Sequence, residues 1–250
     1  MSRPKSPGFL QGFLFVVEGA GLVLRVPSAR KVLLLSILGN LAAMVILVAA
    51  GVGAWLTWGA SYLESLVHGT LGGFLFFFSG AVVLVVLVAM AFVLFPVLVP
   101  VLSGPFHEPL AKRIEAHILG QAPPESSFSF FRGIGHDLSV GLKLLLLDLA
   151  VLLLAGLASL FLGAGLLVGL LLGSWLSALS WLDFPLGRRG YSFSRQRAWV
   201  RSHFPASMGF GLAVTLSFMI PVYNLFLAGP AAAAGASLLY LRAAAAEEEG

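Results

Sequence analysis

The sequence contains no cysteine and very little charge. Its 250 residues include 15 Lys and Arg and 11 Asp and Glu, so 10% of the chain is charged while 59% is hydrophobic. Soluble domains carry about 25% charged residues. So few charges cannot cover a surface that faces water, and the composition therefore predicts that lipid surrounds much of the molecule. We expect an integral membrane protein.

Other absences exclude classes of chemistry. Without cysteine the chain forms no disulfide, thiolate metal site or thiol nucleophile. His107-Glu108 begins like the zinc-protease motif H-E-x-x-H, but Ala111 stands at its fifth position and Pro109 interrupts the helix that the motif requires. The sequence also has no Walker loop, serine elbow or nucleic-acid module. We therefore expect no enzyme, no metal, no cofactor and no nucleic-acid partner.

Long apolar regions are what the sequence has in abundance. A spanning helix needs about 20 apolar residues, and the ranges 29–58 and 71–102 are predicted transmembrane helices on that ground. The range 138–182 would reach about 70 Å as one helix, twice the thickness of the bilayer. It must therefore fold back as a helical hairpin, and glycines that can accommodate the turn stand at Gly156, Gly163 and Gly165.

The last apolar region, 206–241, is interrupted by Pro221 and by Gly229-Pro230. Its first piece would be about 21 Å long as a helix, which is too short to cross the membrane. A helix that stops inside the bilayer must bury its free backbone groups in protein or face a wet cavity. Interrupted segments are typical of transport sites, although a kinked helix packed against its neighbours would explain the same pattern. We expect both hairpins to penetrate the bilayer only in part.

The positions of Lys and Arg predict the topology. They lie in the N-terminal segment through Lys31, in 112–143, in 188–201 and at Arg242. The positive-inside rule places all these segments in the cytoplasm, as expected for a multi-pass protein. The five arginines between 188 and 201 are explained by lipid anchoring.

Two shorter segments, 8–26 and 105–118, are predicted amphipathic helices. Gln11, Glu18 and Arg25 recur every seven residues in the first. In the second, the sequence predicts an apolar face and a polar face, and such helices lie in the headgroup plane. The apolar face contains Leu110, Ile114 and Ile118, and the polar face contains Glu108, Lys112 and Glu115.

One membrane domain over 1–250 accounts for the whole chain, with a basic cytoplasmic segment at 183–205 and a solvated tail at 243–250. Within the apolar runs, charged side chains are costly and need partners. Lys143 and Asp148 lie about 140° apart on an ideal helix and do not pair with each other. Each therefore needs another partner, or water.

The start of the first long helix is the best candidate for a binding site. Pro27-Ser28 is a helix start signal with Ser28 as a possible N-cap. The following amides, of Ala29, Arg30 and Lys31, would then lack intrahelical acceptors and would favour an oxyanion together with the two cationic side chains. The alternative is that Arg30 and Lys31 only anchor the helix to lipid phosphates.

Three stretches of the chain resemble one family. These are "SGPFHEPLAKRIE" at 103–115, "SALSWLDFPLGRRGYSF" at 177–193 and "FGLAVTLSFMIPVYNLFLAGPAAAAGASLLYL" from Phe210. They are similar to the motifs of the bacterial sulfate permease family CysZ, which is related to etoposide-induced membrane proteins of the endoplasmic reticulum. The resemblance implies an all-α membrane fold with two long transmembrane helices and two pairs of partly penetrating helices. It also implies a homo-oligomer in the bacterial inner membrane that takes up sulfate for cysteine biosynthesis.

The resemblance also implies a set of site residues. Members of the family bind sulfate at a P-G-L-R-R turn that opens the first long helix. That turn aligns with Pro27 and with the candidate sulfate ligands Ser28, Ala29, Arg30 and Lys31, where Ser, Ala and Lys replace Gly, Leu and the second Arg. We assign Arg113, Glu115 and Asp183 to a charged constriction on the pathway.

Two hypotheses of function follow from this sequence. The first is a channel or permease for sulfate or a related oxyanion, with membrane lipids and further copies of the chain as partners. The second is a non-transporting membrane scaffold whose basic segments bind anionic lipid or a partner protein.

Overall fold

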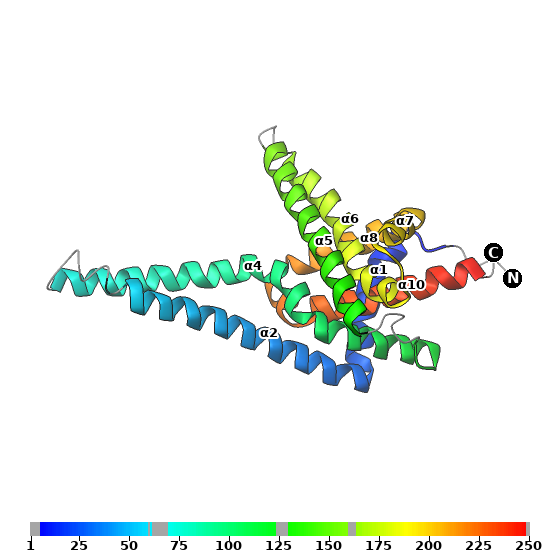
Figure 1. Cartoon of the computed structure of the whole chain (residues 1–250), viewed down its shortest axis with the longest axis horizontal. Coiled ribbons are helices and arrows are strands. Elements are labelled where there is room, and N and C mark those ends of the chain that lie inside the picture. Colours follow the sequence, from blue (N-terminus) through cyan, green and yellow to red (C-terminus); the bar gives the residue numbers. More distant parts are fainter. Residues whose placement is uncertain (1–5, 60, 62–69, 124–129, 160–163, 249–250) are drawn as a thin grey trace. The chain divides into compact units, whose positions relative to one another are not determined.

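The structure is a computed structural model that describes residues 6–59, 61, 70–123, 130–159 and 164–248. Regular structure in this part of the chain is helical, with no strand, which confirms the expected all-α fold (Figure 1). The elements are α1 (Phe9–Arg25), α2 (Pro27–Ala54), the π-helix η1 (Trp55–Gly59), α4 (Thr70–Leu119), α5 (Phe130–Ser159), α6 (Gly165–Arg188), α7 (Phe193–Ser202), α8 (Phe204–Phe218), α9 (Pro221–Tyr223), the π-helix η2 (Asn224–Ala228) and α10 (Gly229–Glu248).

The chain divides into two compact units. The smaller unit is Leu35–Gly104, and the larger comprises Met1–Leu34 and Pro105–Gly250. Within the smaller unit, α2 and α4 lie side by side and run antiparallel (Figure 1). The ring of Trp55 stacks on that of Phe76 with centroids 6.3 Å apart, and a Cβ at Gly51 would lie 2.6 Å from the side chain of Leu87. α4 covers the predicted ranges 71–102 and 105–118 as one helix, and the division between the units follows Gly104.

α10 is the central helix of the larger unit. It contacts α1, α6 and α8, and every residue from Gly229 to Leu239 is buried. Eight of these eleven residues are glycine, alanine or serine, and such small side chains let helix backbones approach closely. α10 continues to Glu248, so the expected tail at 243–250 is helical as far as it is described.

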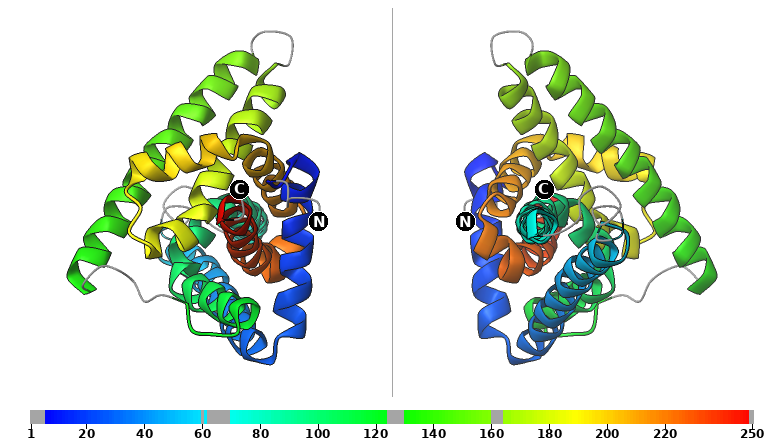
Figure 2. Two further views of the ribbon diagram at one scale, coloured as in Figure 1. Left: turned by 90° about the vertical axis from the view of Figure 1, so that its right-hand side faces the viewer. Right: turned by 90° about the vertical axis from the view of Figure 1, so that its left-hand side faces the viewer.

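α1 packs against α8 and α10 through glycines on one face (Figure 2). A Cβ at Gly12 would lie 2.0 Å from the carbonyl oxygen of Ala206 in α8, and one at Gly19 would lie 2.6 Å from that of Ala231 in α10. The predicted polar stripe of α1 is exposed on the other side. The helix is therefore amphipathic with a buried face that contains Gly12, Phe15, Val16, Gly19 and Val23.

The fold-back predicted within 138–182 is confirmed. α5 ends at Ser159 and α6 begins at Gly165, and the two helices pack against each other. A Cβ at Gly165 would lie 1.9 Å from the Ser159 hydroxyl oxygen, so the close approach at the tip of the hairpin requires glycine. Gly163 lies outside the described residues.

The second hairpin turns where Pro221 predicts a bend. α8 ends at Phe218, Met219 forms its C-cap, and the helix resumes at Pro221. Gly229-Pro230, in contrast, does not stop the chain, because η2 leads directly into α10. Pro230 has no N–H to donate to the preceding turn, and that turn is the π-helix η2.

Four helical segments of the described chain are long and apolar enough to cross a membrane, and the protein is a multi-pass membrane protein. They are Pro27–Gly59, Leu142–Ser159, Gly165–Arg188 and Phe226–Glu248. α8 has only 15 residues and is shorter than a span. In the segment Phe226–Glu248, 72% of the most apolar stretch is buried inside the protein. This segment contains α10, which packs against other helices. Partial penetration of the two hairpins stays a prediction.

We predict that Gly19→Ala lowers the thermal stability of the protein in detergent, while Gly21→Ala does not. The new methyl at position 19 would meet the backbone of α10 at 2.6 Å, whereas a Cβ at Gly21 has nothing within 4 Å. Overpacking of this kind costs about 1–3 kcal/mol, and alanine at an open helical position stabilises by up to about 1 kcal/mol. Equal melting temperatures for the two variants would contradict close packing of α1 on α10.

Candidate functional site

The candidate site begins at the corner between α1 and α2. Val26 is extended, with φ −80° and ψ 113°, and α2 begins at Pro27. The Val26 carbonyl oxygen accepts the amides of both Ala29, at 3.0 Å, and Arg30, at 3.1 Å. The expectation that these two amides are free is therefore wrong, and Val26 rather than Ser28 occupies the N-cap position. Within the described first turn, the Ser28 amide remains as a donor without a backbone acceptor.

The side chains of this first turn divide by exposure. Ala29 is fully buried and fixes the turn against the protein. Ser28, Arg30 and Lys31 are exposed, and in the described part of the chain neither cation has an ion-pair partner. Two cations, one hydroxyl and one amide are therefore available to an anion.

Arg113 of α4 joins this turn. Its Nη1 donates a hydrogen bond of 2.5 Å to the carbonyl oxygen of Ser28. The Arg113 side chain is exposed, while the neighbouring Ile114 is fully buried. Since a guanidinium has five N–H donors, the bond to Ser28 leaves others free to bind an oxyanion. The structure thus brings a predicted constriction residue to the predicted sulfate ligands.

Glu115 points the other way. It is fully buried, at 0% exposure, on the same face of α4 as His107 and Ala111. Its two oxygens lie 3.4 Å from Arg188 Nη2 and 3.0 Å from Arg189 Nη2, both at the end of α6. The guanidinium of Arg189 also lies over the ring of Tyr240, 4.1 Å from its centroid. The spacing of Glu115 from Glu108 and Lys112 predicts a shared polar face. Glu108 and Lys112 do pair with each other, at 3.3 Å, but for Glu115 the prediction is wrong.

Asp183 lies on α6 near these arginines. Its Oδ1 accepts a hydrogen bond of 2.6 Å from Gln196 Nε2 of α7, and the same nitrogen donates to the Tyr191 carbonyl at 3.2 Å. These bonds attach α7 to the end of α6. Glu115 is therefore held by partners at the end of α6, and Asp183 is bonded to a partner from α7.

His107 is a fully buried residue for which the sequence predicts no function. Its ring lies 5.1 Å from that of Trp181 and 6.2 Å from that of Phe184, and neither ring nitrogen has a hydrogen-bond partner among the described residues. A Cβ at Gly229 would lie 2.6 Å from Nε2, so only glycine fits there. Burial lowers the pKa of His107 from 6.5 to about 3, and the ring is therefore uncharged at neutral pH.

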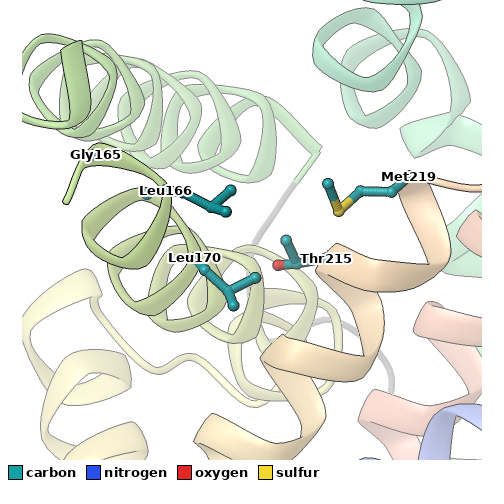
Figure 3. A pocket seen from close by; sticks show the side chains of 6 residues that line it. Gly165, Leu166, Leu170, Thr215 and Met219 are labelled. Atoms are coloured by element: carbon teal, nitrogen blue, oxygen red, sulfur yellow. The ribbon is translucent and has the colours of Figure 1, made fainter. Parts of the chain in front are cut away.

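A groove of about 270 Å³ lies at the far end of α6 from Arg188 (Figure 3). Leu166 and Leu170 of α6 face Thr215 and Met219 at the end of α8. The Thr215 hydroxyl lies 3.0 Å from that of Ser177. The described residues that line the groove include no charged side chain, and this apolar lining does not fit the capture of an anion. Among the residues that the structure describes, no three His, Asp or Glu side chains gather as metal ligands.

Removal of the Glu115 charge is predicted to destabilise the protein. In Glu115→Gln the buried Arg188 side chain, 1% exposed, loses a partner, and breaking a buried pair costs about 3–5 kcal/mol. Glu108→Gln is the matched control, because its pair with Lys112 is about 40% exposed and is worth at most about 1 kcal/mol. Thermal unfolding in detergent measures both, and equal stability of the two variants would refute a structural ion pair at Glu115.

His107 is predicted to make the protein sensitive to acid. Its pKa is lowered in the folded state, so below pH 6.5 the unfolded chain binds a proton that the folded chain does not. The contribution of His107 to the free energy of unfolding is therefore fully present above pH 6.5. It is lost as the pH falls towards 3, and the loss is about 2 kcal/mol at pH 5. Unfolding from pH 7 to pH 4 should show a smaller decrease for His107→Asn than for the wild type. The exposed His117→Asn serves as control, and parallel curves for all three proteins would contradict the prediction.

Comparisons with known proteins agree on one family. The family model "Sulfate transporter CysZ/Etoposide-induced protein 2.4" matches residues 15–228. A protein named Sulfate transporter CysZ from Pseudomonas paraeruginosa (strain DSM 24068 / PA7) is 27% identical over 238 residues, 93% of this chain and 95% of its own. Its namesake from Pseudomonas fluorescens (strain Pf0-1) is 28% identical over 251 residues, 95% and 96% of the two chains. The match reaches from α1 to η2 and so includes the first turn of α2, Arg113 and the buried ion pair. The chain therefore belongs to the Sulfate transporter CysZ/Etoposide-induced protein 2.4 family.

Proposed function

We propose that this protein moves sulfate across the bacterial inner membrane, as a channel or permease that supplies cysteine biosynthesis. The observation that carries the proposal is the cluster of exposed donors at the start of α2, to which Arg113 is hydrogen-bonded. The names of relatives that match more than nine-tenths of the chain support sulfate as the substrate. The remaining partners in this proposal are membrane lipids and further copies of the chain in a homo-oligomer.

The first step in this proposal is capture of the dianion. Arg30 and Lys31 attract sulfate at the membrane surface, and Arg113 offers a planar pair of N–H groups that fits two oxygens of one oxyanion. The amide and hydroxyl of Ser28 supply neutral donors beside these charges. Ala29 contributes its position rather than a donor, because its amide is bonded to Val26 and its side chain is buried.

Hydrogen bonding between Arg113 and Ser28 also orients the site. A free arginine side chain loses much conformational entropy when it binds a ligand. Here one Nη1 bond to a backbone carbonyl already restrains the guanidinium, so less entropy is lost on binding sulfate. The same bond from Arg113 offsets the partial negative charge of the Ser28 carbonyl oxygen. This oxygen would otherwise repel the anion.

The second step is passage through a constriction that we assign to Arg113, Glu115 and Asp183. A hydrated dianion is costly to move through hydrocarbon, and a route with many unbalanced cations would hold it too tightly. Glu115 balances Arg188 and Arg189, so this region offers donors without a large excess of positive charge. Glu115 and Asp183 keep the neighbouring donors in position in this proposal.

Sulfate flux into liposomes tests the proposal. The sulfate flux of the double variant Arg30→Ala/Lys31→Ala should be at least about tenfold lower than that of the wild type. The reason is that hydrogen bonds to charged groups contribute about 1.5–3 kcal/mol each. The matched control Arg201→Ala/Arg242→Ala removes two exposed cations from α7 and α10 and should keep the flux. Monodisperse elution of all variants in detergent establishes that they fold.

Two results would contradict the proposal. Wild-type flux in the Arg30→Ala/Lys31→Ala variant would remove the capture site from the mechanism. No sulfate flux by the wild type at any protein density would favour the non-transporting scaffold.

A further inference from the structure

One aromatic ring in the larger unit lies against two cations from different helices. The ring is that of Phe193, the first residue of α7. Lys143 Nζ of α5 lies 5.6 Å from its centroid, and the guanidinium carbon of Arg197 lies 5.2 Å from it. Figure 2 shows α7, in yellow, reaching across to α5, in green. Two cations from different helices thus contact the same neutral side chain.

Among the residues whose side chains the structure describes, no acid neutralises these two cations. Neither Lys143 nor Arg197 has an ion-pair partner in the described part of the chain, and the sequence has no Asp or Glu from 184 to 246. Asp148 lies on a different face of α5, about 140° around the helix from Lys143. The Arg197 Nε atom is buried and has no hydrogen-bond partner in the part of the chain that the structure describes. Two like charges that contact one ring repel each other, and an anion bound to both would offset this repulsion.

The surface next to Lys143 is apolar and uncovered. Lys143 lies near the start of the predicted apolar range 138–182, where its long side chain can extend to the depth of the lipid phosphates. Four exposed leucines of α5 are spaced four, three and four residues apart, starting beside Lys143. This spacing places them in one stripe along the helix. They are Leu142, Leu146, Leu149 and Leu153, with exposed fractions of 55%, 58%, 52% and 61%.

We propose that Lys143 and Arg197 bind the phosphate of an anionic phospholipid whose acyl chains lie along the leucine stripe of α5. The two cations supply charge-assisted bonds to the phosphate. The stripe supplies the apolar contact that a small inorganic anion would not need. Phe193 holds both cations in place through cation–π contacts. A phospholipid bound at this point connects α5 with α7, which Gln196 in turn attaches to α6.

This lipid site is separate from sulfate transport. It shares no residue with the first turn of α2 or with Arg113, and it concerns α5 and α7 rather than α2 and α4. Binding of lipid can therefore be measured without sulfate, and the result does not depend on whether the protein transports sulfate.

The test is lipid binding to the full-length protein in detergent, measured by native mass spectrometry. Phosphatidylglycerol is compared with phosphatidylcholine of the same acyl chains. Lys143→Gln/Arg197→Gln should bind phosphatidylglycerol about 30-fold more weakly than the wild type, because each cation near the surface contributes about 1 kcal/mol. Phosphatidylcholine should bind weakly to both. Arg25→Gln/Arg242→Gln is the matched control, since it removes two exposed cations elsewhere, and it should bind like the wild type.

A second variant keeps both charges. Phe193→Leu removes the ring between the cations and should weaken binding of phosphatidylglycerol several-fold, even if the charge variant proves unstable. The proposal is overturned if the charge variant keeps the wild-type preference for phosphatidylglycerol, or if the control loses as much as the charge variant. It is also overturned if inorganic phosphate displaces the lipid at equal concentration, since the site would then bind small anions.

Discussion

Close packing between helix backbones is the constraint on which the larger unit depends. Between helices in lipid there is little hydrophobic driving force, so the energy of association must come from van der Waals contact and interhelical hydrogen bonds. α10 has small side chains along its buried length, and Gly12 and Gly19 of α1 meet backbone atoms of α8 and α10 where a methyl group would not fit. The corner at Val26, and with it the first turn of α2, is positioned by this packed α1.

α4 connects this core to the candidate site through its two faces. Arg113 reaches out to the Ser28 carbonyl, and Glu115, two residues further, is buried against Arg188 and Arg189. Since residues two apart point in nearly opposite directions on a helix, one short stretch can attach to the first turn of α2 and to the end of α6. The buried ion pair thus fixes the rotation of α4 about its axis, and that rotation directs Arg113 to the cations of α2.

Much of the fold follows from run lengths, because the membrane allows few solutions. The excessive length of 138–182 required a hairpin, and Pro221 required a bend; both are present. The face of Glu115 was not predictable in this way, since a charged residue at a polar spacing is normally solvated and its partners stand more than seventy residues further along the chain. The hydrogen bonds to the Val26 carbonyl depend on the local backbone conformation at the corner between α1 and α2, which the sequence pattern does not specify. The contact between Arg113 and Ser28 joins residues that are 85 positions apart, and no pattern in the neighbouring sequence predicts it.

Whether an oxyanion binds at the first turn of α2 is the central question. Selenate has the shape and charge of sulfate and scatters anomalously, so a crystal of the full-length protein grown with selenate would locate the anion directly. The account predicts an anomalous peak within hydrogen-bonding distance of the Ser28 amide, Arg30, Lys31 and Arg113. A peak at another place, with none at this turn, would contradict it.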